Sequence, residues 1–388
     1  MIFVGVDISK YKHHCCIINE LGEIVQSEFS FENTREGFAV FLSAVEQCGS
    51  EETRIGFEST GHYACNLVQF LDKSGLSYME LNPVLVRQFI RSRTLRKTKT
   101  DKLDALQIAV YLTTVEYKPH PKPLYDVSGL KSLTRFRFQL VKKRSQYLVA
   151  LTTVLDAMFP EFKPFFGNKF TATALYILEN YPTPAKIANM NVRSFDTLRR
   201  VSYGRFTMLH FTKLKQLAKD TIGEDSEALQ IQLKTLMELH SEIDAKITAL
   251  EKTISRIVRE IDPPLLSIKG VGEQTAAVIL AEYGDISRFS SPAKMLSFAG
   301  LEPGIAQSGS TEYKGRMVKH GSSYLRYAIL RCCDAIMLNN EVFAQYYSKK
   351  IAEGKTYNVA KTHLAKKLIR VIYTLETTGT RFDLEKLR

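Results

Sequence analysis

The chain has 388 residues, 45% of them hydrophobic and 24% charged, an ordinary balance for a soluble globular protein of two or three domains. Its 53 Lys and Arg residues against 41 Asp and Glu residues leave a net charge of +12, which favours a polyanionic partner, most often nucleic acid. No run approaches the roughly 18 apolar residues of a membrane-spanning helix, and MIFVGVDISK is typical of a strand rather than a signal peptide. The six cysteines lack CxxC spacing, which excludes a disulfide framework and a zinc site, so we expect a cytoplasmic protein.

The first 115 residues predict strands and helices in a defined order. Apolar and β-branched runs predict strands at 2–8, 12–19, 23–31, 53–58 and 76–81, and helical spacing predicts helices at 35–48, 62–75, 84–91 and 101–115. The order β-β-β-α-β-α-β-α-α is that of the ribonuclease H-like fold. It predicts a mixed sheet with helices on both faces, in which the first and fourth strands are neighbours at the centre.

The rest of the chain predicts mainly helices. Residues 116–127 hold three prolines and are typical of a linker, and 128–158 predict a long basic helix. Residues 160–225 match no motif. Residues 229–261 carry an apolar seam, interrupted at His240, whose alternating spacing of four and three predicts a coiled coil. The alternative is one long helix packed within its own chain. Pro263 ends this helix, so we expect domains at 1–127, 128–262 and 263–388.

Four acidic residues indicate a metal site in the first domain. Asp7 and Glu58 end two apolar strands that the expected topology places side by side, and Asp101 and Asp104 share one face at the start of a helix. Capping of the helix alone also explains an acid at Asp101. Carboxylates without Cys or His suit Mg²⁺ or Mn²⁺. Two such ions would stabilise the attacking and leaving oxygens of a phosphodiester displacement.

A basic segment adjoins this predicted metal site. Its cations at 91–99 are candidate phosphate ligands: Arg91, Arg93, Arg96, Lys97 and Lys99. The alternative is a solvated charged loop.

The C-terminal region holds two further candidates. Gly270 and Gly272 precede an apolar helix, an arrangement that resembles the helix-hairpin-helix module and could expose backbone N–H groups to a phosphate. A glycine turn without a ligand is the alternative. Ser308 lies in a small polar segment that we expect to be an exposed loop, where it is either a turn residue or a nucleophile. The cations that follow it could clamp a phosphate: Lys314, Arg316, Lys319 and Arg326.

Taken together, these motifs resemble the IS110-type or DEDD transposases, with the Piv DNA invertases as relatives. VGVDISK, GFESTGHY and KTDKLDA resemble the RuvC-like N-terminal domain of that family. SIKGVGEQTAAVILAEYGD, FAGLEPGIAQSG and GRMVKHGSSYLR resemble its C-terminal transposase domain. The implied fold class is α/β plus α: a RuvC-like domain, long coiled-coil helices and a mainly helical C-terminal domain with a helix-hairpin-helix-like segment.

The resemblance implies a function and a set of roles. Asp7, Glu58, Asp101 and Asp104 would bind the divalent metal and be catalytic, and Ser308, or Ser310 two residues on, would attack DNA to form a phosphoserine link. It also implies donor and target DNA, a structured guide RNA, and dimers or tetramers assembled through the coiled coil. Two other functions stay open: a RuvC-like Mg²⁺-dependent nuclease or junction resolvase, in which water attacks, and a non-catalytic nucleic-acid-binding scaffold.

Overall fold

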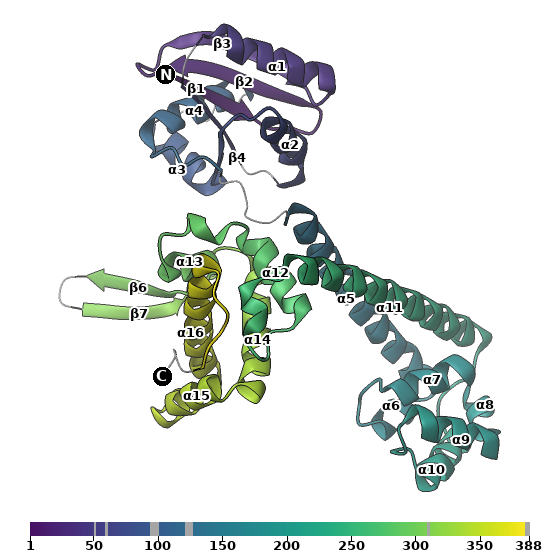
Figure 1. Cartoon of the computed structure of the whole chain (residues 1–388). Helices are drawn as coiled ribbons and strands as arrows, with labels where there is room; N and C mark the ends of the chain where they lie inside the picture. Colours follow the sequence, from purple (N-terminus) through teal and green to yellow (C-terminus); the bar gives the residue numbers. More distant parts are fainter. Residues whose placement is uncertain (50–51, 59–60, 94–100, 121–126, 309–310, 385–388) are drawn as a thin grey trace. The chain divides into compact units, whose positions relative to one another are not determined.

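The computed structural model describes residues 1–49, 52–58, 61–93, 101–120, 127–308 and 311–384. For residues 101, 102, 128, 305–308 and 311–316 it describes the backbone alone. The chain forms two compact units, Met1–Lys122 and Pro123–Arg388, and Figure 1 labels most of their elements. Within the described parts of the chain, no helix combines the length and the apolar character needed to cross a membrane.

The first unit is a five-stranded mixed sheet with helices on both faces (Figure 1). Its strand order is β3-β2-β1-β4-β5; β1 is antiparallel to β2 and parallel to β4, so the predicted central pair is confirmed. The elements are β1 (Ile2–Asp7), β2 (Lys12–Asn19), β3 (Ile24–Glu32), α1 (Arg35–Gln47), β4 (Thr53–Glu58), the 3-10 helix η1 (Gly61–Ala64), α2 (Cys65–Lys73), β5 (Tyr78–Leu81), α3 (Pro83–Arg93) and α4 (Asp101–Thr114).

Alternation along the central strands divides the core of this unit into two layers. Val4 and Val6 of β1 and Phe57 of β4 pack on one face, with the apolar residues of α1 and α2. Phe3 packs on the other face, with the apolar residues of α3 and α4. Gly5 lies on that second face because α4 crosses it closely: a Cβ at Gly5 would be 2.3 Å from the carbonyl oxygen of Ala105.

The second unit is helical apart from one hairpin. Its elements are α5 (Ser128–Met158), α6 (Phe162–Phe165), α7 (Ala172–Asn180), α8 (Pro184–Ala188), α9 (Val192–Val201), α10 (Met208–Lys219), α11 (Glu227–Ile261), the 3-10 helices η2 (Pro264–Ser267) and η3 (Ile286–Arg288), α12 (Glu273–Tyr283), α13 (Pro292–Phe298), β6 (Pro303–Ser308), β7 (Thr311–Met317), α14 (Ser323–Asn339), α15 (Glu341–Ala352) and α16 (Tyr357–Thr378).

The long helices α5 and α11 lie side by side (Figure 1). The predicted seam of α11 is buried at Leu233, Ile247 and Ile254, and His240 is buried within it. Arg137 pairs with Glu251 across the two helices. The seam is therefore covered by α5 of the same chain, which is the in-chain alternative to a coiled coil between copies. The helix ends before Pro263, as the sequence predicts.

Residues 160–225, which match no motif, fold into a small helical bundle. Helices α6 to α10 surround an apolar core that includes Phe162, Phe195 and Phe211. Leu151 of α5 and Leu233 of α11 join this core. The segment thus forms a small bundle at the end of the α5–α11 pair where α5 ends and α11 begins.

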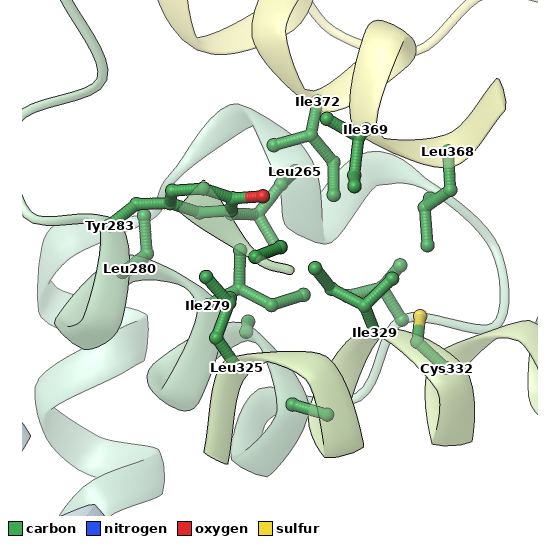
Figure 2. Close-up of a cluster of buried hydrophobic side chains, with 14 of the residues drawn as sticks. Leu265, Ile279, Leu280, Tyr283, Leu325, Ile329, Cys332, Leu368, Ile369 and Ile372 are labelled. Atoms are coloured by element: carbon green, nitrogen blue, oxygen red, sulfur yellow. The ribbon is translucent and has the colours of Figure 1, made fainter. Parts of the chain in front are cut away.

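The C-terminal helices share one large core, which Figure 2 shows. Ile279 and Leu280 of α12 meet Leu325 and Ile329 of α14 and Leu368 of α16, all buried. The segment expected to be a loop around residue 308 is instead the antiparallel hairpin β6–β7. Its alternation of Thr311, Glu312, Tyr313 and Lys314 is a strand pattern that the surrounding glycines obscure in the sequence.

Candidate active site

The sheet brings two of the predicted carboxylates to one edge. Val6 of β1 is level with Phe57 of β4, and Asp7 and Glu58 are the next residues, at the carboxyl ends of these parallel strands. Each lies two residues after a glycine that faces α4, Gly5 or Gly56. Because side chains alternate along a strand, Asp7 and Glu58 project from the sheet face that α4 covers.

Helix α4 places Asp104 above the same edge. Asp104 directly precedes Ala105, whose carbonyl oxygen lies over Gly5. After the helix, the hydroxyl of Tyr117 donates to the carbonyl oxygen of Ile55 at 3.3 Å, nearer the amino end of β4. The helix therefore begins toward the carboxyl ends of the strands. Asp101 is the first residue of α4, and its side chain lies outside the described residues.

The donor chemistry of this edge fits a hard divalent cation, because the side chains at the strand ends are carboxylates. Among the described residues, no group of three or more His, Cys, Asp or Glu side chains is arranged to hold a metal ion. Asp101, the fourth predicted ligand, is not among the side chains that the structure describes.

His14 is a neighbour of Asp7 that the sequence analysis missed. It lies directly opposite Asp7 on β2, so the two side chains share one sheet face. Its Nδ1 is 2.7 Å from Oε1 of Glu28 on β3, and both side chains are about one-fifth exposed. The sequence predicted strands at 2–8 and 12–19, but the register that pairs residue 7 with residue 14 is visible only in the structure.

The predicted basic segment is described in part. Arg91 and Arg93 are exposed on the last turn of α3, and the guanidinium carbon of Arg93 lies 5.5 Å from the centre of the Phe89 ring. Arg96, Lys97 and Lys99 lie outside the described residues.

Ser308 is the last residue of β6, paired with Thr311 of β7 at the end of the hairpin. The side chains of Ser308, Lys314 and Arg316 lie outside the described part, as does the whole of Ser310. In Figure 1 the hairpin projects from the helices of its own unit.

Two further candidate cations follow the hairpin. Lys319 is exposed. Arg326, on α14, is half-buried, and its Nη1 donates to the carbonyl oxygen of Ala299 at 3.3 Å. Arg326 is therefore partly engaged in holding α14 against the turn after α13.

The glycine turn has a packing role of its own. Gly270 has φ +104°, and a Cβ there would lie 2.9 Å from the Cα of Ile336 on α14. Gly272 is the N-cap of α12, as the helix-hairpin-helix resemblance requires, but the preceding helix is only the four-residue 3-10 turn η2. Close packing against α14 therefore explains Gly270 without a bound phosphate.

Comparison with known proteins identifies the family. Residues 4–160 match the model of DEDD transposases of the IS110 type, described as "Transposase", and residues 262–348 match the model described as "Transposase IS116/IS110/IS902 family". The chain belongs to the IS110 family of transposases. The first match contains all four predicted carboxylates, and the second contains the glycine turn, Ser308 and the cations after it.

Similar proteins span the whole IS110-family chain. The "Insertion element IS110 uncharacterized 43.6 kDa protein" of Streptomyces coelicolor is 23% identical over 98% of this chain and 95% of its own length. The "Transposase for insertion sequence element IS1111A" of Coxiella burnetii is 23% identical over 96% and 89%. The "Pilin gene-inverting protein" of Moraxella bovis is 21% identical over 98% and 97%.

This IS110-family chain also contains a cavity that the sequence analysis did not predict. It measures about 210 Å³, lies among α5, α12 and α14, and is lined by Phe138, Gln274, Tyr324, Tyr327 and Arg331, among others. On α14, the spacing i, i+3 and i+7 places three of the lining side chains on one face of the helix: Tyr324, Tyr327 and Arg331.

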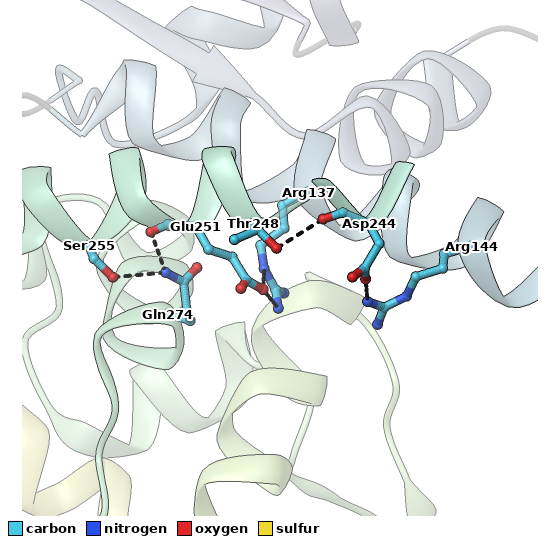
Figure 3. Close-up of polar contacts among 7 residues, drawn as sticks. All are labelled: Arg137, Arg144, Asp244, Thr248, Glu251, Ser255 and Gln274. Carbon is cyan, nitrogen blue, oxygen red and sulfur yellow. Dashed lines mark hydrogen bonds and ion pairs between the residues drawn. The ribbon is translucent and has the colours of Figure 1, made fainter. Parts of the chain in front are cut away.

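Arg137 and Gln274, which line this cavity, belong to the polar network drawn in Figure 3. Nε2 of Gln274 donates to the carbonyl oxygen of Glu251 at 2.8 Å and to Oγ of Ser255 at 3.1 Å. Nε of Arg137 donates to Oε1 of the same glutamate at 2.7 Å. The network ties α5, α11 and α12 together behind the cavity.

Arg135, which also lines the cavity, forms an ion pair with a buried carboxylate. Arg135 donates two hydrogen bonds to Glu282, at 2.6 and 2.9 Å, and the Glu282 side chain is only 2% exposed. Burial alone would raise the pKa of Glu282, but hydrogen bonds from Arg135 and Ser322 outweigh it and lower the pKa. The carboxylate is therefore charged and depends on Arg135.

Proposed function

We propose that this transposase is a site-specific DNA recombinase of an insertion element, which cuts and rejoins DNA through a serine–DNA ester. The observation that carries the proposal is the placement of Asp7 and Glu58 at adjacent strand ends, beneath the helix that bears Asp101 and Asp104. The strand order β3-β2-β1-β4-β5 supports a RuvC-like, ribonuclease H-like fold for this region.

The four carboxylates would hold a divalent metal, Mg²⁺ or Mn²⁺. When bound, the metal would supply Lewis-acid stabilisation of the charge that develops on the phosphate oxygens. Asp7 and Glu58 are fixed by the sheet and the two aspartates by α4, so the donor set is positioned by two regular elements rather than by loops.

Ser308 would supply the nucleophile. Its hydroxyl oxygen would attack the scissile phosphorus and lose its proton, and the DNA oxygen that leaves would take up a proton as the P–O bond breaks. One phosphodiester is replaced by another, so bond energy is retained for rejoining and no ATP is required. The position of Ser308 at the end of a hairpin supports access to a large substrate.

The proposed recombinase function also implies binding partners. Relatives named as a transposase and as a gene-inverting protein support DNA as the substrate. Arg91, Arg93 and Lys319 are exposed cations that would contact phosphates, with Gly270 and Gly272 as a second backbone contact. A structured guide RNA and assembly into dimers or tetramers are the further partners that the family resemblance implies.

An excision assay in cells tests the proposal. The gene is carried with its native flanking DNA, and the excised circular junction is detected by PCR. We expect Asp7→Ala and Ser308→Ala to abolish circles, with Glu46→Ala, an exposed acid on α1, as the matched control that leaves them unchanged. Ser310→Ala decides between the two serines.

Two outcomes would contradict the proposal. Circles that survive Ser308→Ala and Ser310→Ala but not Asp7→Ala would indicate RuvC-like hydrolysis, with water as the nucleophile. Circles that survive Asp7→Ala would remove the carboxylates from the chemistry and indicate a nucleic-acid-binding scaffold.

A further inference from the structure

We propose that the cavity among α5, α12 and α14 binds an unpaired nucleobase of single-stranded DNA or RNA. This inference rests on the proposed function, because it assumes a nucleic-acid substrate. It assigns to α14 a binding role separate from the carboxylates and from Ser308.

The size of the cavity limits its occupant. At about 210 Å³ it is smaller than the roughly 300 Å³ at which pockets for cofactors and drug-sized ligands begin. It has room for one planar group and not for a base pair. A base would therefore have to be extruded from a duplex or belong to an unpaired strand.

Aromatic rings form one wall. Tyr324 and Tyr327 of α14 both meet Phe138 of α5 edge to face, with ring centres 4.9 and 5.8 Å apart. Tyr327 is 55% exposed, so much of its ring remains available for contact. Single-stranded nucleic acid is bound by stacking of bases on such rings, which every base can do.

Arg331 places a cation beside these aromatic rings. Arg331 lies one helical turn after Tyr327, and its side chain is 66% exposed. The carboxylate nearest to it, Asp334, is 3.8 Å away and is also 2.6 Å from the Nζ of Lys361. Arg331 therefore keeps positive charge toward solvent, where it can contact the phosphate of a base stacked on Tyr327.

Gln274 of α12 also lines the cavity. Oε1 of Gln274 is buried and has no hydrogen-bond partner among the described residues, although Nε2 of the same amide is doubly engaged. Gln274 therefore holds α12 against α11 behind the cavity. The exposed aromatic ring and the cation thus indicate one planar, phosphate-linked ligand.

Fluorescence of 2-aminopurine tests the proposal on the full-length protein. The probe is placed in a single-stranded DNA oligonucleotide and, separately, in an RNA of the same sequence, which distinguishes the two sources. We expect Tyr327→Leu to weaken binding by about 5- to 150-fold and to abolish quenching of the probe, and Tyr327→Phe to restore both. Arg331→Gln should weaken binding and reduce its dependence on salt.

The matched control is Tyr203→Leu, because Tyr203 is 92% exposed in the same unit and outside the cavity. Unchanged binding and quenching in Tyr327→Leu would overturn the inference, as would equal competition by a fully paired duplex. A loss in Tyr203→Leu equal to that in Tyr327→Leu would also overturn it. Binding by Asp7→Ala separates this test from the proposed function, because that variant should keep the base-binding signal while losing excision.

Discussion

At the scale of single residues, two glycines let α4 lie close to the strands that carry Asp7 and Glu58. Gly5 and Gly56 let the helix approach the two central strands, and Asp7 and Glu58 follow them by two positions. The sequence allowed both acids to be predicted at strand ends. It could not show that the two glycines let α4 lie close to the sheet, because a close approach of two backbones leaves no pattern of apolar residues in the sequence.

Gly5→Ala should therefore destabilise the first unit. The added Cβ would lie 2.3 Å from the carbonyl oxygen of Ala105 and 2.4 Å from the backbone nitrogen of Ala109, so it must displace a helix. We expect a cost of about 1–3 kcal/mol or more, measured by urea unfolding. Gly129→Ala, where a Cβ meets nothing within 4 Å, should be neutral or stabilise by up to about 1 kcal/mol. Equal stability of Gly5→Ala and the wild type would contradict the account of α4.

At the scale of elements, the long helix α11 is held by its own chain. The apolar seam was predicted correctly as a helix surface, and both a coiled coil and an in-chain packing explained it. The spacing alone could not distinguish the two arrangements, because α5, the helix that covers the seam, lies about 100 residues away in sequence. Arg144 of α5, for example, pairs with Asp244 of α11. The β6–β7 hairpin was missed because its strands are rich in polar residues and contain glycine.

The link between α5 and α12 should depend on Arg135. Arg135→Ala would leave the buried Glu282 carboxylate without its principal counter-ion. The Arg135 side chain is 42% exposed, so solvent screens part of the interaction. We expect Arg135→Ala to lower the free energy of unfolding by about 2–3 kcal/mol. The double variant Arg135→Met/Glu282→Leu should recover most of it, since no buried charge remains. Arg256→Ala, which breaks an exposed pair with Glu260, is the control and should cost under about 0.5 kcal/mol. A double variant no more stable than Arg135→Ala would contradict the claim that an unpaired Glu282 carboxylate causes the loss.

The α5–α11 pair should weaken in mild acid through His240. Burial lowers the pKa of His240 below its ordinary value of 6.5, with Asp244 raising it and Arg144 lowering it further. The unfolded chain therefore binds the proton more readily. His240 favours folding fully above pH 6.5, and this contribution falls as the pH drops below that value, by up to about 1.4 kcal/mol per pH unit.

His240→Leu should remove this dependence. Thermal unfolding of wild type and variant between about pH 5 and 8 should show the variant gaining stability over the wild type as the pH falls through 6.5. A difference that stays constant over this range would show that His240 does not titrate on unfolding.

At the scale of the whole molecule, the proposed chemistry is divided between two compact units. The carboxylates belong to Met1–Lys122, and Ser308 belongs to Pro123–Arg388. The sequence predicted the elements on which the four carboxylates lie, because motif and periodicity are local, but it predicted a loop at Ser308, where the structure has strand β6. It did not predict the base-binding cavity, because Phe138, Gln274 and Tyr327 are each distant in sequence and meet only after α5, α12 and α14 have packed.

The central claim is that the carboxylates and the serine act in one covalent reaction. The most direct measurement is mass spectrometry of the protein isolated from cells that carry the element, after digestion with protease and nuclease. We predict a peptide containing Ser308 that carries a nucleotide on its serine in the wild type, and no such peptide in Asp7→Ala or Ser308→Ala. Excision that proceeds in the wild type with no nucleotide on any serine peptide would contradict the account and leave hydrolysis as the mechanism.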